Sequence, residues 1–416
     1  MSISANDRAA LRELAKRVAE AAASPVNAKR VQRSKDTHSL KPVRPLVWLD
    51  EIPWHEMDFD GLLTPRCEDE EARAIEIGFR RLLMRWDYFQ ADMVVSPYFY
   101  VDKAYTDSGI GLDVSEDVLA VDRSNNIVSH RYVDQLDTPE KVDALEIPVL
   151  TADPALDERR VDQAESLFGD ILPVRLRGHL IYYAPWDTIG RLRGVENCLI
   201  DMAERPEFIH RIVAKFTEIG TARINQMVQL DLLGLELSSL HCTPPYTNEL
   251  PAPDWDGGRV RLKDVWFRGM AQLFAAASPA MHEEFDIAYM RPLMERCGLS
   301  YYGCCEPLDR VIPYLKKVSN LRKIGVSPWA NARSSAEQIG GDYVFARKPN
   351  PALVAGTLDP GAVRADIMET VEACQANGCP YEFVLKDIST VGYKPGNLVE
   401  WVRVVERTLD EYYPED

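Results

Sequence analysis

Short apolar runs alternate with amphipathic stretches along most of the 416-residue chain. Eight of these runs combine apolar and β-branched residues with flanking turn residues, which is typical of buried strands. Amphipathic stretches of helical length separate most of them, and parallel pairing requires crossovers of that length. Eight strands with helical crossovers predict an α/β fold, a (β/α)8 TIM barrel. The predicted strands span 44–51, 91–101, 173–183, 232–240, 298–305, 321–329, 342–349 and 381–390.

Two stretches show the helical pattern most clearly. Apolar residues from Leu199 to Ile219 form one stripe within a predicted helix over 195–230. A second helix is predicted to begin after Ser278, because serine is a favourable N-cap and Pro279 fits the first helical position.

Two segments lie outside this alternation. Residues 1–43 are predicted to form an N-terminal helical arm, because apolar residues between Leu11 and Val18 recur at helical spacing. Residues 109–145 alternate like a β-hairpin and then offer a helix start at Thr138. We expect this segment to be an insertion after the second strand, so that the barrel domain spans 44–416.

Charge and cysteine content narrow the functional classes. The formal net charge is -17 and the pI is near 5.0, which argues against binding a nucleic-acid backbone. The eight cysteines do not resemble a secreted disulfide framework, and we see neither a leader peptide nor an apolar run of membrane-spanning length. We therefore expect a cytoplasmic protein that acts on a small molecule, with neither a nucleic acid nor a membrane as partner.

Thiols and an imidazole follow two of the predicted strands. Barrel enzymes keep their chemistry at the C-terminal strand ends, and Cys304 and Cys305 end the fifth predicted strand. His241 and Cys242 follow the fourth. Thiolate and imidazole groups bind zinc, so these residues could form a tetrahedral site if the two loops converge. The alternative is that a cysteine is simply buried in the core.

Acidic and basic side chains follow the first and last predicted strands. Glu51 and His55 follow the first strand, where they could transfer protons. Lys386 follows the last strand, where an amine can bind an anion, form an imine or pair with Asp387. We predict Glu51, His55 and Lys386 as catalytic residues.

Further residues are predicted to contact the substrate. The direction of His179 stays undecided, because it points either into the barrel or toward a helix. The loop 243–267 carries Trp255 and Trp266, which suit either a lid over a flat substrate or the interface of a homodimer. The predicted substrate contacts are His179, Trp186, Tyr302, Glu306 and Arg347.

Several segments resemble the uroporphyrinogen decarboxylase superfamily over residues 44–412. They are "TPEKVDALEIP", "VRLRGHL" with the following "PWD", "ERPEFIHRIVAKFTEIGTARINQMVQLD" and "SPAMHEEFDIAYMRPLMERCG". This superfamily consists of (β/α)8 barrels and includes corrinoid-linked methyltransferases, so the resemblance implies that fold. The porphyrinogen decarboxylases carry an arginine-rich loop after the first strand, where this chain has the acidic "WLDEIPWHEM". That difference disfavours a polycarboxylate porphyrinogen as substrate.

The chain is more similar to the methyltransferase branch, whose members bind zinc through a His-x-Cys-Gly motif on the fifth strand. Tyr302 stands at the His position, Cys304 keeps the Cys and Cys305 replaces the Gly. Lys386 stands near the place of the family's last cysteine ligand. The resemblance implies a zinc-dependent methyltransferase whose thiol acceptor takes a methyl group from a corrinoid on a partner protein. Cys304, Cys305 and His241 are the predicted metal ligands.

Two other interpretations stay open. One is a metal-independent lyase or decarboxylase of a small carboxylate or an aromatic compound, with Arg347, Lys348 or Lys386 binding the anion. The other is a non-catalytic binding subunit of a methyltransferase complex. Methyl transfer requires a metal or a corrinoid partner, whereas the lyase requires a cationic pocket, so the three interpretations can be distinguished.

Overall fold

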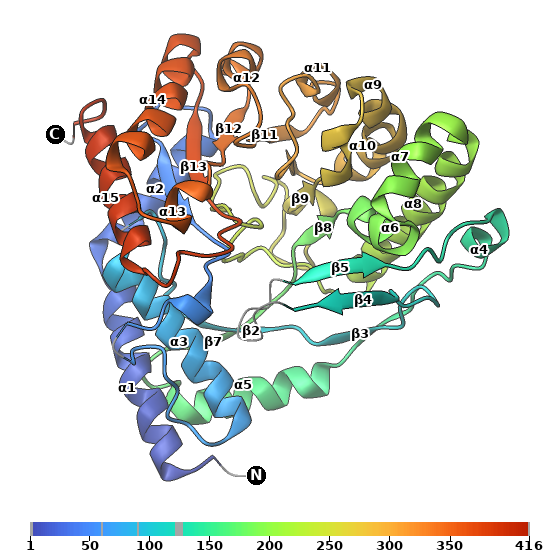
Figure 1. Ribbon diagram of the computed structural model, residues 1–416. Helices are drawn as coiled ribbons and strands as arrows, with labels where there is room; N and C mark the ends of the chain where they lie inside the picture. The colour runs from blue at the N-terminus through green and yellow to red at the C-terminus, as the bar shows by residue number, and fades with distance from the viewer. Residues whose placement is uncertain (1–2, 60, 90, 121–127, 415–416) are drawn as a thin grey trace.

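Seven parallel strands form one sheet in which successive strands are neighbours in space (Figure 1). The order is β8, β9, β10, β11, β12, β13, β1, so the last strand of the chain pairs with the first. This singly wound order is compatible with a TIM barrel. The computed structural model describes residues 3–59, 61–89, 91–120 and 128–414. The strands of the sheet are β1 (Leu46–Leu49), β8 (Ile181–Tyr183), β9 (Trp266–Gly269), β10 (Leu299–Tyr302), β11 (Leu321–Val326), β12 (Val344–Arg347) and β13 (Tyr381–Leu385).

Helices pack around the outside of these strands (Figure 1). Several begin as the sequence predicts: the Ser278 hydroxyl accepts a hydrogen bond from the Met281 amide, and Pro279 occupies the first helical position. No helix in the described ranges is long and apolar enough to cross a membrane. The helices are α1 (Ala5–Ala22), α2 (Pro25–His38), α3 (Glu70–Tyr88), α4 (Pro139–Asp143), α5 (Pro154–Phe168), α6 (Pro185–Arg193), α7 (Val195–Glu204), α8 (Pro206–Gln229), α9 (Pro279–His282), α10 (Ala288–Met294), α11 (Ile312–Leu315), α12 (Ala332–Ile339), α13 (Ala352–Ala355), α14 (Pro360–Asn377) and α15 (Gly396–Asp410).

Six of the eight predicted strands contribute to this sheet, and two do not. The run at 91–101 contains β2 (Phe99–Asp102), which pairs with β7 (Val174–Arg177) in a separate two-stranded ladder. The run at 232–240 forms only one bridge, between Leu233 and His179. In its place the sheet contains β9, which lies partly within the stretch that the sequence predicts as a loop.

The hairpin insertion and the helical arm both form. Strands β4 (Glu116–Leu119) and β5 (Ser129–Tyr132) pair antiparallel, and Thr138 caps the following α4. In the arm, the apolar side of α1 contributes Leu11 and Val18 to a buried cluster that also contains residues of α3 and α5. The arm thus packs on the body of the same chain, while the domain boundary at residue 43 stays a prediction.

The two faces of the sheet differ in chemistry. The outer face carries Phe267, Ile324 and Phe383, which belong to the main apolar cluster shared with the helices. The opposite face carries Arg268 and Lys323 among small and aromatic side chains. Both of these cations are completely buried, although charged groups are rarely buried unless they are paired.

A buried network pairs one of these cations. The Lys323 ammonium donates to both carboxylate oxygens of Glu382, at 2.9 and 3.0 Å, and to the Thr243 hydroxyl at 2.6 Å. The Thr243 hydroxyl in turn donates to Glu382 at 2.8 Å. The side chains of Lys323 and Glu382 are 0% exposed, so this network joins β11 and β13 to the loop that contains Thr243 without help from solvent.

Removing one partner of this ion pair should destabilise the fold strongly. Lys323→Met would leave the Glu382 carboxylate buried and unpaired, which should lower the free energy of unfolding by about 3–5 kcal/mol. The double variant Lys323→Met, Glu382→Leu removes both charges and should recover most of that loss. Urea unfolding followed by circular dichroism measures both. A single variant that loses less than about 1 kcal/mol would contradict this account.

Candidate active site at the strand ends

Reactive side chains from four segments of the chain come together. Three of these segments follow strands of the sheet, and the fourth follows the run at 232–240. Glu51 follows β1, Cys304 follows β10 and Lys386 follows β13. His241 and Cys242 lie beyond the 232–240 run. The side chains are linked by the contacts described below, so loops of this sheet edge that are far apart in sequence form one cluster. Their position after the strands matches the face where barrel enzymes carry their chemistry.

Glu51, His241 and Cys242 could hold one metal ion. Each offers one ligand atom, and these atoms lie within 4.8 Å of one another. The Cys242 thiol donates to Glu51 Oε1 at 3.3 Å, and the Asp387 amide donates to Glu51 Oε2 at 3.0 Å. A nitrogen, sulfur and oxygen set suits zinc, and three protein ligands leave a position for a substrate, as in catalytic zinc sites.

The backbone that carries these ligands is strained. Glu51, His241, Cys242 and Asp387 have φ values of 47°, 45°, 70° and 55°. A positive φ is uncommon for residues other than glycine, and residues held in such conformations cluster at functional sites. Four such residues within one cluster therefore support a functional role for it.

The neighbours of Cys304 favour its ionised form, beside the candidate metal ligands. Its sulfur accepts a hydrogen bond from Lys386 Nζ at 2.9 Å and lies 3.6 Å from Cys305 Sγ. The hydrogen bond from Cys305 lowers the pKa of Cys304 most, followed by one from His241 and by the charges of Arg268 and Lys386. The same bond to Cys304 raises the pKa of Cys305, whose sulfur also lies 2.8 Å from Asp387 Oδ2, an alternative acceptor for its single proton. The pKa values of the two cysteines are therefore shifted in opposite directions.

Two buried residues position the Cys304 turn. Glu306 accepts from the Cys304 amide at 2.9 Å and from the Ala271 amide at 3.1 Å. Arg268 donates to the Gly303 carbonyl at 2.9 Å and lies 4.2 Å from the centre of the Tyr301 ring. Arg268 was not among the residues predicted from the sequence, because no strand was predicted at β9. An arginine between apolar residues at the end of a proline-rich loop was the available signal.

The predicted site residues His55 and His179 contact residues outside the cluster. His55 lies on the turn Trp54–Glu56, with its ring against Tyr393 and Nε2 at 3.4 Å from Glu56. His179 Nε2 bonds to the Lys103 carbonyl at 2.6 Å. Among the described residues, neither histidine forms a hydrogen bond or an ion pair with Glu51 or Cys304. Their predicted roles in catalysis and substrate binding stay predictions.

Trp186 and Arg347 are buried away from the cluster. Trp186 packs edge-on against Phe274, at 4.9 Å between ring centres, inside an apolar cluster of α6, α7 and α8. Arg347 donates to the Ser327 carbonyl at 2.8 Å and pairs with Asp366 on α14. Trp266, in the predicted lid, is instead a buried residue of β9 that donates to the Pro245 carbonyl. A substrate would reach these side chains only if their present partners moved.

Tyr302 belongs to a buried polar network beneath α9. Its hydroxyl donates to Asp286 Oδ2 at 2.5 Å, and His282 Nε2 lies 2.6 Å from the Tyr302 hydroxyl oxygen. Burial raises the pKa of Asp286 well above its usual range and lowers the pKa of His282 to about 3. The His282 imidazole is therefore neutral near pH 7, and the Tyr302 phenol links it to Asp286.

The chain is similar in structure to a methyltransferase from Methanosarcina mazei. The two share 12% sequence identity with a TM-score of 0.51, and the match covers 92% of this chain and 99% of that chain. At this identity the likeness shows the fold alone. No protein-family model and no curated protein matches the chain. The chain therefore has a methyltransferase-like α/β fold, and its chemistry must be inferred from the cluster.

The neutral His282 predicts how stability depends on pH. Its folded pKa of about 3 lies below its ordinary value of 6.5, so the unfolded chain binds the extra proton first as the pH falls. The contribution of His282 to the free energy of unfolding is therefore fully present above about pH 6.5. Below that pH it falls by about 1.4 kcal/mol per pH unit toward pH 3.

Urea unfolding of the wild type and of His282→Gln across pH 4 to 8 isolates this contribution. The difference between the two free energies of unfolding should be constant above about pH 6.5 and should shift against the wild type below it. Parallel curves over the whole range would contradict a neutral buried His282.

Proposed function

We propose that the chain is a methyltransferase of the uroporphyrinogen decarboxylase type, with a (β/α)8 barrel, in which a zinc ion activates a thiol acceptor and a corrinoid on a partner protein is the methyl donor. The observation that carries this proposal is the convergence of Glu51, His241 and Cys242 beside the Cys304 thiolate. The fold likeness to a methyltransferase supports it. The ligands proposed here are Glu51, His241 and Cys242. The sequence predicted Cys304, Cys305 and His241, so only His241 is common to the two sets.

Each residue of the cluster would have a different role in such a reaction. Zinc, when bound, would lower the pKa of an acceptor thiol and hold the thiolate for attack. Burial and then the charge of Glu51 raise the pKa of Cys242, so Cys242 remains a thiol until a cation favours its ionised form. Glu51 Oε1 lies 3.3 Å from that sulfur and can take its proton. Lys386 balances the negative charge at Cys304.

Metal content separates the two possible ligand sets. Wild-type protein purified with zinc should hold about one ion per chain, measured by mass spectrometry of the element. His241→Ala and Cys242→Ala should each lower the zinc affinity by at least about tenfold, whereas the double variant Cys304→Ala, Cys305→Ala should retain the ion.

The exposed His130, which pairs with Glu116 on the hairpin, provides a matched control. His130→Ala should bind zinc as the wild type does. Loss of zinc in the Cys304, Cys305 double variant with retention in Cys242→Ala would restore the ligand set predicted from the sequence. Absence of zinc from every protein would overturn the zinc mechanism.

Methyl transfer can be tested with free methylcobalamin as a surrogate donor and a series of small thiols as acceptors. Loss of the cobalt-bound methyl group changes the visible absorbance of the corrinoid. The wild type should accelerate this loss, and His241→Ala should reduce the rate by about tenfold or more. His130→Ala again serves as the control. No acceleration with any thiol, despite bound zinc, would contradict methyl transfer from a corrinoid to a thiol.

A buried cationic face favours a lyase as the second candidate. Arg268 and Lys348 both lie against the Tyr301 ring, at 4.2 and 5.0 Å from its centre. Neither forms an ion pair with a carboxylate among the described residues, and burial lowers the pKa of Lys348 to about 8. Such cations could bind a small carboxylate. Release of carbon dioxide from a small carboxylate substrate would favour this candidate if it persists after metal ions are removed with a chelator and is lost in Lys348→Met.

A further inference from the structure

A large cavity lies apart from the candidate active site. Its volume is about 1230 Å³, and the helical arm, α3, α5, β2, the segment 234–238 and the start of β9 enclose it. None of the cluster residues Glu51, His241, Cys242, Cys304 or Lys386 lines it. The volume exceeds the roughly 300–1,000 Å³ of common small-molecule pockets. The cavity therefore has room for a substantial ligand of its own.

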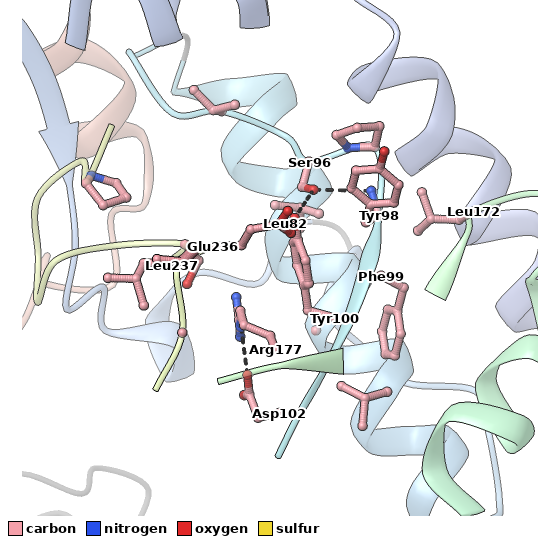
Figure 2. A pocket seen from close by; sticks show the side chains of 18 of the residues that line it. Leu82, Ser96, Tyr98, Phe99, Tyr100, Asp102, Leu172, Arg177, Glu236 and Leu237 are labelled. Atoms are coloured by element: carbon pink, nitrogen blue, oxygen red, sulfur yellow. Dashed lines mark hydrogen bonds and ion pairs between the residues drawn. The ribbon is translucent and has the colours of Figure 1, made fainter. Parts of the chain in front are cut away.

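The inner wall of the cavity is mainly apolar and aromatic. Tyr98 and Tyr100 extend from the β2 segment, with Leu237 and Glu236 on the opposite side (Figure 2). Burial and then a hydrogen bond to Glu236 raise the pKa of Tyr100 to about 12, so its phenol keeps its proton. Further apolar lining comes from Val18, Val31, Ile75, Phe79, Leu82, Leu172 and Leu235. This wall suits a long or flat apolar body.

The acidic residues of the lining already have partners. Asp102 pairs with Arg177 at 2.7 Å, a contact visible in Figure 2. Glu236 pairs with Arg175 at 3.1 Å. Asp264 pairs with Arg261 and Glu71 accepts from Gln163, each at 2.8 Å. Three of these four carboxylates are therefore compensated by an arginine, whereas Glu71 keeps its charge because its partner is a neutral amide.

Two cations of the lining are left over. Lys35 on α2 and Arg160 on α5 both line the cavity. In the described part of the chain, neither side chain forms an ion pair or a hydrogen bond, and both are at least partly accessible. In a protein of net charge -17, two unpaired cations beside an apolar cavity form a local site for negative charge. The cavity thus combines an apolar wall with cationic groups.

From this combination we infer that the cavity binds an amphipathic anion, with its carboxylate, sulfonate or phosphate head at Lys35 or Arg160 and its apolar body against the tyrosine and leucine wall. The head would form charge-assisted hydrogen bonds with the cation beside it. The body would exclude water from the apolar lining. This site is independent of the proposed methyl transfer, because it shares no residue with the cluster.

Dansyl-undecanoate, a fluorescent carboxylate with an apolar chain, probes this site, and its methyl ester is the neutral analogue. The wild type should bind one carboxylate per chain and should bind the ester at least about tenfold more weakly. Lys35→Ala, Arg160→Ala should weaken carboxylate binding by about tenfold or more and leave ester binding unchanged. Lys29→Ala, Arg159→Ala removes two exposed cations from the same helices outside the lining and should bind as the wild type does.

A variant that fills the cavity completes the test. Gly78 on α3 lines the cavity, and a Cβ added there would meet no atom within 4 Å. Gly78→Phe should therefore fold with an unchanged melting temperature and block the probe. Unimpaired binding to folded Gly78→Phe, or equal affinity for the acid and the ester, would overturn the inference. Dodecyl phosphate and dodecanoate as competitors then distinguish a phosphate from a carboxylate head.

Discussion

The buried ion pair between Lys323 and Glu382 is the constraint on which the candidate site depends. An ammonium and a carboxylate with no exposed surface tolerate each other only while both keep their partners, and Thr243 is bonded to both. Thr243 directly follows His241 and Cys242, whose backbone has positive φ values. Strained backbone persists only where the surroundings over-determine it. The pair thus supplies a rigid anchor for the two residues that complete the metal cluster.

Two cysteines of the cluster have opposite properties, and their neighbours explain why. Cys304 lies beside Lys386 and receives hydrogen bonds, which together stabilise negative charge. Cys242 is buried and faces the carboxylate of Glu51, which opposes negative charge. A thiol in that position becomes a good ligand only when a cation offsets both effects. A cation bound at this cluster would therefore favour ionisation of Cys242, whereas the neighbours of Cys304 already favour its ionised form.

Local sequence predicted the helices and the helix-facing side of the sheet better than the opposite face of the sheet. Helix starts such as Ser278 depend on neighbouring residues, and the outer strand face follows the apolar pattern, so both could be predicted. Strand β9 could not, because it has only four residues and contains the buried Arg268, whose partners include the Gly303 carbonyl and the Tyr301 ring from a distant part of the sequence. The run at 232–240 has strand composition but forms a single bridge, since tertiary contacts override propensity.

The convergence of Glu51, His241 and Cys242 was hard to predict for a geometric reason. The family motif places a histidine at the position of Tyr302, but the Tyr302 side chain belongs to the helix-facing cluster and bonds to Asp286. A ligand on that face could not reach Cys304, because alternate residues of a strand point to opposite sides. Nitrogen and oxygen donors must then come from other loops, as His241 and Glu51 do. Convergence of separate loops depends on the whole fold and leaves no spacing signal in the sequence.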